Sequence, residues 1–194
     1  MSDVPNLLTD FLEIEKLVES QPEGARAEIV RGTYLFSPRP RFRHLKAQGR
    51  LLGLLESRYG EAGGEDRADE WTFVSEPEIR SERAFSRLIP DVAGWRRSPG
   101  WPGQDESLIT LVPDFVAEVL SPGTEEVDRG PKREAYGLMG VGWHWILDPD
   151  ARRVETFTNE RGTMVAGPTL GAGDILSAPP FEGLTARVDA LFAP

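Results

Sequence analysis

The sequence predicts a mixed α/β or α+β fold with the order helix, strands, helix, strands, helix, strands. Three stretches carry apolar residues at helical spacing, and strand-like runs rich in Val, Ile, Phe and Trp separate them. The chain has 194 residues and 39% hydrophobic residues, values typical of one folded domain. We therefore expect a single domain over residues 1–194.

The first half of the chain predicts two helices and a strand pair. Thr9 or Asp10 can cap a first helix, whose apolar residues recur at helical spacing from Phe11 to Val18. Residues 27–36 indicate either a strand pair that turns at Gly32 or one long strand. The Leu-rich residues 44–59 predict a second amphipathic helix, and a polar, Gly-rich loop is expected to follow it.

The second half predicts strands around a third helix, over residues 128–139. Pro131 fits that helix only if it lies in the first turn. Beyond residue 164, Gly and Pro divide the chain into short apolar pieces. The expected strands are residues 71–74, 87–95, 109–120 with an interruption at Pro113, 143–147 and 154–158.

Composition excludes several classes of protein. The chain has no cysteine, so disulfides, thiolate nucleophiles and thiolate zinc sites are absent. Its two histidines, His44 and His144, lie too far apart in the sequence for an HExxH protease motif. No apolar run reaches the roughly 18 residues of a membrane helix, and the N-terminus does not resemble a signal peptide, so we expect a cytoplasmic protein. The net charge of −10 argues against non-specific coating of nucleic acid.

One carboxylate stands where a strand is expected to be apolar. Within residues 115–120, Glu118 is flanked by core-type residues, and alternation puts it on one face with Asp114, Val116 and Leu120. An ionised Glu is rarely buried without a partner. Glu118 therefore either faces water on an edge strand or lies in a cleft with a cation, an arrangement that suits carboxylates and Mg²⁺.

A second acid, Asp91, follows Pro90 inside another apolar run. Locally, a plain turn explains Asp91. Together, however, Asp91 and Glu118 could form a divalent-metal site for phosphodiester hydrolysis.

A lysine could assist such a site by stabilising the nucleophile or the developing charge. Lys132 lies at the start of the helix that follows Glu118, and Tyr136 is expected on the same helix face, packed against the lysine stem. The alternative is a surface lysine that pairs with a nearby acid such as Glu134.

The run of residues 113–122, followed by Lys132, Tyr136 and residues 145–149, resembles the Uma-type family of putative restriction endonucleases. These are compact bacterial members of the PD-(D/E)xK nuclease superfamily. Upstream, residues 27–32 are similar to the family's Glu-containing first strand, and Pro90 with Asp91 to its Pro-Asp strand. The resemblance implies an α/β restriction-endonuclease-like fold, with a mixed central β-sheet flanked by helices.

The resemblance also implies site residues. Asp91 and Glu118 would bind Mg²⁺ or Mn²⁺, Glu28 would be an additional acidic member, and Lys132 would orient or activate water. The superfamily's lysine normally lies two residues after the second acid, at what is here Leu120, so the lysine has moved to the following helix. A further departure is His144, where the family usually has Tyr. The implied activity is metal-dependent endonucleolytic hydrolysis of DNA, by a homodimer because a double-strand cut needs two sites.

Two other functions stay open. A degenerate member could bind nucleic acid or a protein partner without cleavage, or the enzyme could act on a nucleotide or another small phosphate. Ser121 is not expected to be a nucleophile because no GxSxG motif surrounds it. A nuclease needs a basic surface near its acids, and the candidate clusters are Arg39/Arg41/Arg43, Arg80/Arg83/Arg87 and Arg96/Arg97.

Overall fold

The computed structural model describes residues 7–22, 26–36, 39–60, 71–97 and 101–193. The helices are α1 (Leu7–Glu19), α2 (Phe42–Tyr59), α3 (Glu125–Val127), α4 (Arg133–Met139) and α5 (Asp189–Phe192), with a π-helical turn, η2 (Asp128–Lys132), between α3 and α4. The strands are β1 (Ala27–Val30), β2 (Thr33–Phe36), β3 (Trp71–Ser75), β4 (Ile79–Ser81), β5 (Ser86–Leu88), β6 (Val92–Arg96), β7 (Phe115–Val119), β8 (Trp143–Asp148), β9 (Arg153–Glu160) and β10 (Thr163–Leu170).

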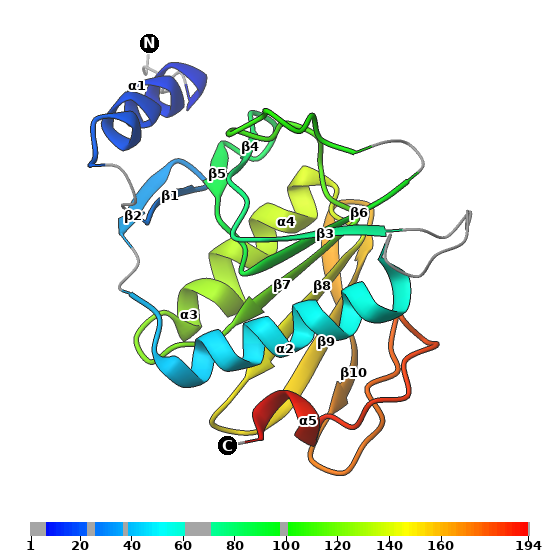
Figure 1. Ribbon diagram of the computed structural model, residues 1–194. Helices are drawn as coiled ribbons and strands as arrows, with labels where there is room; N and C mark the ends of the chain where they lie inside the picture. The colour runs from blue at the N-terminus through cyan, green and yellow to red at the C-terminus, as the bar shows by residue number, and fades with distance from the viewer. Residues whose placement is uncertain (1–6, 23–25, 37–38, 61–70, 98–100, 194) are drawn as a thin grey trace.

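Within the described residues the strands form two sheets (Figure 1). The larger has the order β10-β9-β8-β7-β6-β3, and the smaller has the order β2-β1-β5-β4. In the larger sheet β7 pairs in parallel with β8 and antiparallel with β6, so this sheet is mixed. The mixed α/β fold expected from the sequence is confirmed. No helix of the described residues is both long and apolar enough to cross a membrane.

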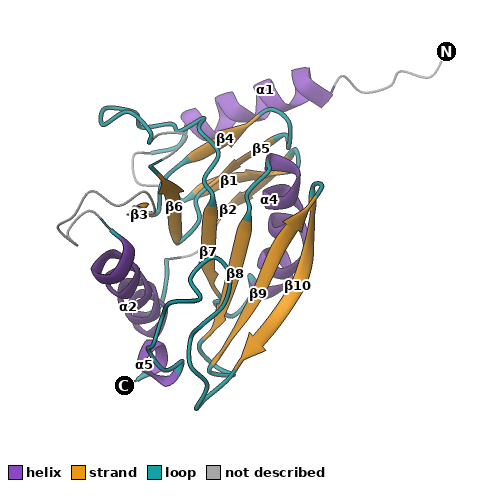
Figure 2. Cartoon of the chain, turned by 90° about the vertical axis from the view of Figure 1, so that its right-hand side faces the viewer, coloured by secondary structure: helices purple, strands orange, loops and turns teal. Residues whose placement is uncertain are grey.

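Strand β7 is buried on both faces, because α2 and α4 cover opposite sides of the larger sheet (Figure 2). Phe115, Ala117 and Val119 pack into one hydrophobic cluster with residues of α2, whereas Val116 and Leu120 pack into another with residues of α4. The alternation predicted for this run is therefore confirmed. A strand covered on both faces is mostly apolar, and the polar exception here is Glu118.

The strand pair expected over residues 27–36 forms as the hairpin β1–β2. Arg31 and Gly32 both have positive φ, at 50° and 77°, as a two-residue hairpin turn of type I′ requires. Helix α1 packs Phe11 and Val18 against this smaller sheet. The first and second helices are confirmed, although they begin at Leu7 and Phe42 rather than where the sequence indicated. The loop expected after α2 lies largely outside the described residues.

Two predicted strands are wrong in extent. Residues 87–95 do not form one strand, because Pro90 interrupts the run where the chain leaves β5 of the smaller sheet and enters β6 of the larger. Of residues 109–120, only Phe115–Val119 is a strand, and the part before Pro113 is irregular. Strands β4 and β10 were not expected, since neither segment alternates regularly between apolar and polar residues.

The third helix also differs from expectation. The helical segment begins at Glu125, so Pro131 lies in the π-helical turn η2 instead of the first turn. Proline lacks the amide hydrogen of a regular α-helix, and a π-turn already interrupts the i→i−4 hydrogen-bond ladder. This turn buries both Asp128 and Lys132 on the side of the segment that faces β7.

Candidate active site

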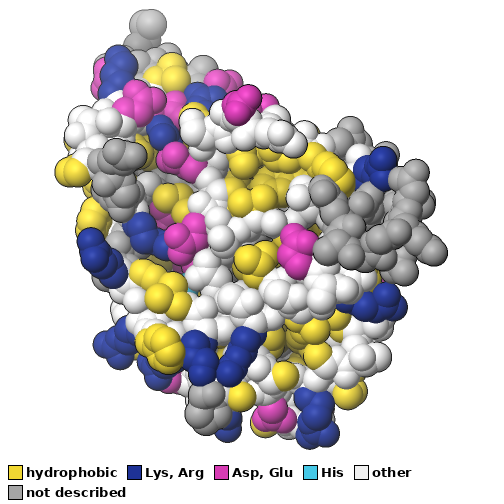
Figure 3. Space-filling model, viewed as in Figure 1, with side chains coloured by type: hydrophobic (Ala, Val, Ile, Leu, Met, Phe, Trp, Pro, Cys, Tyr) yellow, Lys and Arg dark blue, Asp and Glu magenta, His cyan; other side chains and the backbone are white. Residues whose placement is uncertain are grey.

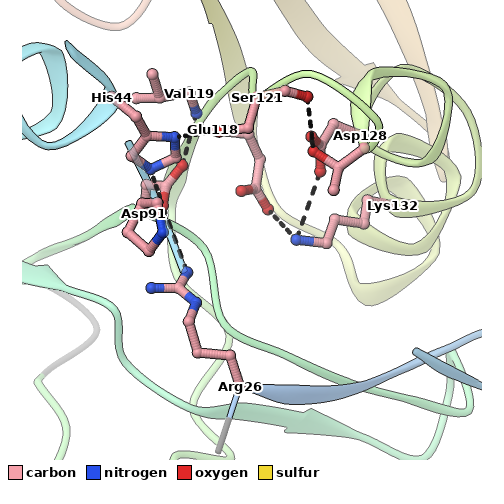
Figure 4. A pocket seen from close by; sticks show the side chains of 10 residues that line it. Arg26, His44, Asp91, Glu118, Val119, Ser121, Asp128 and Lys132 are labelled. Atoms are coloured by element: carbon pink, nitrogen blue, oxygen red, sulfur yellow. Dashed lines mark hydrogen bonds and ion pairs between the residues drawn. The ribbon is translucent and has the colours of Figure 1, made fainter. Parts of the chain in front are cut away.

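A cavity of about 40 Å³ lies beside the carboxyl end of β7, between the start of α2 and η2 (Figure 4). It brings together three of the four predicted site residues, Asp91, Glu118 and Lys132. The fourth, Glu28, contacts Lys132 from strand β1. The lining residues are Arg26, Pro40, His44, Asp91, Glu118, Val119, Ser121, Thr124, Asp128 and Lys132.

Glu118 lies in the interior of the larger sheet and is only 3% exposed, so the edge-strand interpretation is wrong. Its Oε1 accepts a hydrogen bond of 2.5 Å from the Tyr136 hydroxyl and one of 3.2 Å from Lys132 Nζ. Burial raises the pKa of Glu118 well above its usual value, and the charges of Asp128 and Asp91 add to this against the opposing charge of Lys132.

Lys132 is 5% exposed and is surrounded by carboxylates. Its Nζ lies 3.0 Å from Glu28 Oε1, 3.2 Å from Glu118 Oε1 and 3.5 Å from Asp128 Oδ1. Burial lowers the pKa of Lys132, but the three carboxylates outweigh it, so the pKa is raised well above the usual value. The expected approach of this amine to Glu118 is confirmed. Pairing with Glu134 is wrong for the described structure, because Glu134 contacts Arg31.

Glu28 connects the smaller sheet to the site. It lies on β1, is almost fully buried, and its Oε1 accepts a hydrogen bond of 2.8 Å from the backbone amide of Ile89. The same oxygen contacts Lys132. Glu28 therefore fixes the ammonium and, at the same time, the segment that leads into Asp91.

Asp91 lies at the bend between β5 and β6, so the turn expected at Pro90 is present and nevertheless directs the carboxylate inward. Its Oδ2 accepts a hydrogen bond of 2.7 Å from the amide of Val119, directly after Glu118. Its Oδ1 accepts one of 2.9 Å from His44 Nε2, and Arg26 lies 3.6 Å from the same oxygen. These contacts hold Asp91 against the end of β7.

Sequence reasoning missed three residues of this site and the main contact of a fourth. His44, on α2, joins Asp91 to the hydroxyl of Ser121, which lies 2.9 Å from His44 Nδ1. Arg26 supplies a second cation, and Asp128 is a third carboxylate partner of Lys132. Tyr136 donates a hydrogen bond to Glu118, whereas the sequence predicted only packing against the lysine stem. The i, i+4 spacing of Asp128, Lys132 and Tyr136 was a usable signal for the last two.

The donor set fits a hard divalent cation. Four buried carboxyl groups, those of Glu28, Asp91, Glu118 and Asp128, face the two cations Lys132 and Arg26, so acidic groups outnumber basic ones. Among the described residues, no three acidic or histidine side chains form a group that could enclose an ion by themselves. Magnesium, however, is commonly held by one or two carboxylates, with water and substrate phosphate completing its shell.

The predicted arginine clusters differ in their pairing. Arg80 and Arg87 pair with glutamates of α1 and of the smaller sheet's loops, and Arg96 pairs with Asp114. Within the described residues, Arg39 and Arg41 have no carboxylate partner. The unpaired positive charge is thus next to Pro40, which lines the acidic cavity.

Comparisons with known proteins bear on the family and on the fold of the chain. The family model Uma2, described as putative restriction endonuclease, matches residues 8–189. Among solved structures, the chain is similar to a putative nuclease belonging to DUF820 from Anabaena variabilis ATCC 29413. The TM-score is 0.74 at 16% sequence identity, over 92% of this chain and 96% of that chain, a likeness that shows a shared fold. No protein with a curated description matches the chain.

Proposed function

Because the chain belongs to the Uma2 family of putative restriction endonucleases, we propose that it is an endonuclease that hydrolyses DNA with Mg²⁺ or Mn²⁺. The observation that carries this proposal is the buried ammonium of Lys132 between Glu118 and Glu28, beside a cavity that also contains Asp91. A purely structural ion pair would not need an open cavity at its side. The fold and the family support nuclease chemistry in general.

Asp91 and Glu118 are the residues that would hold the cation. When bound, the cation would supply Lewis-acid polarisation of the phosphate and promote ionisation of water. The hydrogen bonds described for Glu118 fall on Oε1, while the residue itself lines the cavity. Tyr136 and Lys132 therefore hold one oxygen of Glu118 and orient the carboxylate.

Lys132 acts as a fixed cation in this proposal. Since its pKa is raised, it stays protonated near neutral pH and cannot serve as the base that removes a proton from water. Its charge instead orients the nucleophile and stabilises charge that develops on the phosphate. Arg26 is placed to add a second positive charge, and His44 keeps Asp91 in position.

Two other functions are less well supported. A cavity of about 40 Å³ is far below the roughly 300–1,000 Å³ of pockets that enclose small molecules, which disfavours an enzyme for a free nucleotide. Ser121, His44 and Asp91 form a hydrogen-bonded row like that of a serine hydrolase. The neighbouring carboxylate of Glu118, however, would repel the oxyanion of that reaction, so we expect no labelling by a fluorophosphonate probe.

The test is cleavage of plasmid and of labelled duplex oligonucleotides with Mg²⁺, Mn²⁺ or EDTA. We expect cleavage with either metal and none with EDTA. Asp91→Ala and Glu118→Ala should abolish it while the melting temperature stays level or rises, since clustered negative charge is removed. Lys132→Arg should lose most activity, because a planar guanidinium cannot replace an ammonium held by three carboxylates.

Lys16→Arg is the matched control, on the exposed side of α1, and should keep full activity. Full activity of Asp91→Ala would contradict the assignment. Absence of cleavage by the wild type, together with binding of DNA, would favour a degenerate member. We also propose a homodimer, and light scattering that gives the mass of one chain under assay conditions would refute it.

A further inference from the structure

A second cavity, of about 240 Å³, lies between the first turns of α2 and the C-terminal helix α5. Phe42, Arg43 and Lys46 line it from α2, and Pro149, Leu191 and Phe192 line the opposite side. It is smaller than the roughly 300–1,000 Å³ of a pocket for a drug-sized ligand. Its aromatic and aliphatic walls with a cationic rim suit one flat ring attached to an anionic chain.

Phe42 is unusually exposed at the mouth of this cavity, at 76%. The ammonium of Lys46 lies 5.6 Å from the centroid of its ring, and Arg43, which also lines the cavity, pairs with Asp150. A single exposed aromatic residue is common on protein surfaces. An exposed aromatic ring among cations and beside a cavity is the combination found where proteins stack bases of single strands.

The surroundings of Phe42 are locally positive in a chain of net charge −10. Arg39 and Arg41 are exposed, and neither pairs with a carboxylate of the described residues. Figure 3 shows Lys and Arg side chains gathered at the lower left, toward the side where α2 begins in Figure 1. The arginines at Arg80, Arg87 and Arg96 are by contrast neutralised within the protein.

The two cavities lie on opposite sides of the same helical turn. Pro40 and His44 line the acidic cavity, whereas Phe42 and Lys46 line the second one. Residues two apart in a helix point about 200° apart, so the start of α2 separates the cavities by the width of one helix. A strand that reaches both cavities would have to pass this turn.

We propose that this surface, defined by Arg39, Arg41, Phe42 and Lys46, binds an unpaired base and the phosphates next to the bond that is cleaved. The inference rests on the proposed function and specifies its substrate: DNA with a single-stranded or locally opened segment. Phe42 stacks on the base, and the cations hold the flanking backbone.

The test measures binding apart from cleavage. Fluorescence anisotropy in EDTA compares a labelled single-stranded oligonucleotide with the duplex of the same sequence. We expect the single strand to bind more tightly than the duplex. Phe42→Ala should weaken binding of the single strand roughly tenfold, and Phe42→Trp should retain the wild-type affinity. Phe36→Ala, at a second exposed phenylalanine of 63% exposure on β2, is the matched control and should change nothing. Both residues are surface-exposed, so the variants are expected to fold.

Charge and stacking are tested separately. Arg41→Ala should weaken binding and lower its salt dependence, whereas Lys16→Ala, which removes an exposed cation of α1, should not. A 2-aminopurine base should be quenched by the wild type and less so by Phe42→Ala. Two affinity results would overturn the inference: wild type and Phe42→Ala bind the single strand equally well, or Phe36→Ala weakens binding as much as Phe42→Ala does. A dimer that dissociates only in Phe42→Ala would also overturn it.

The inference and the proposed function can fail independently. Binding that depends on Phe42 without any cleavage would refute the enzyme and keep the base site. Cleavage of fully paired duplex at the same rate in wild type and Phe42→Ala would keep the enzyme and refute the base site.

Discussion

On the α2 side of β7, Phe115 packs edge-on against Trp145 and Phe181, with ring centroids 5.4 and 4.9 Å apart. On the α4 side of the same strand, Glu118 lies between apolar neighbours and contacts Lys132 and Tyr136. The residues of β7 are buried on both faces. One face is stabilised by burial of apolar area alone, and the other must also compensate buried charge.

The two faces of β7 differ in how regular the helix that covers them is. The α2 face is covered by an uninterrupted helix of 18 residues, whereas the α4 face is covered by a segment with a π-turn. That turn directs Asp128 and Lys132 toward the carboxylates. Buried ionic groups seldom stabilise a fold more than apolar residues of the same size would. We infer that the charged face is kept for function, and the following predictions test this comparison.

The largest expected effect is that of Lys132→Met. It leaves Glu118 and Glu28 buried without their cation, and loss of one partner of a buried pair costs about 3–5 kcal/mol. Urea unfolding should show this loss, and addition of Glu118→Gln to the same chain should recover part of it. Lys16→Met, at an exposed position of α1, should stay within about 0.5 kcal/mol of the wild type. If Lys132→Met had the same free energy of unfolding as the wild type, the carboxyl cluster would not be ionised.

The second expected effect concerns His144, which is fully buried at the border of the α4 face. Neither ring nitrogen has a hydrogen-bond partner among the described residues. Burial, with the nearby charges of Arg133 and Lys132, lowers its pKa to about 3.

The sign of the resulting pH dependence follows from protonation of the unfolded chain. Below the ordinary pKa of 6.5 the unfolded chain binds a proton that the folded chain refuses, so stability is lost as pH falls toward 3. His144→Phe removes this loss. The free energy of unfolding of the variant minus that of the wild type should therefore be about 2 kcal/mol larger at pH 5 than at pH 8. Parallel stability curves of the two proteins would refute it.

The smallest expected effect is that of Glu118→Gln on stability. The folded carboxyl has a raised pKa, so above the ordinary value of 4.5 the unfolded chain releases its proton first and wild-type stability falls as pH rises. The variant should therefore melt roughly 2–4 °C higher near pH 7, about 1 kcal/mol, and the gap should close below pH 4.5. Glu134→Gln, an exposed carboxylate on α4, should show no such gap. If Glu118→Gln melted below the wild type at neutral pH, burial of the Glu118 charge would not destabilise the fold.

Much of this site followed from local pattern. Glu118 was identifiable because a charged residue interrupts an apolar run, and Lys132 because the chain has few lysines and this one follows the strand. The catalytic roles of Asp91, Glu118, Glu28 and Lys132 remain predictions. His44 and Arg26 were not identifiable, because their contacts with Asp91 join residues far apart in the sequence.

The sequence by itself determined the mixed α/β class, the first two helices, the two faces of β7 and the residue types available for chemistry, since each depends on composition or on periodicity along a short segment. Only the tertiary structure decided that Pro90 carries the chain from one sheet to the other, that Glu118 is interior, and that η2 turns Lys132 inward. These features depend on pairings between distant segments, in which burial and charge compensation outweigh local preference.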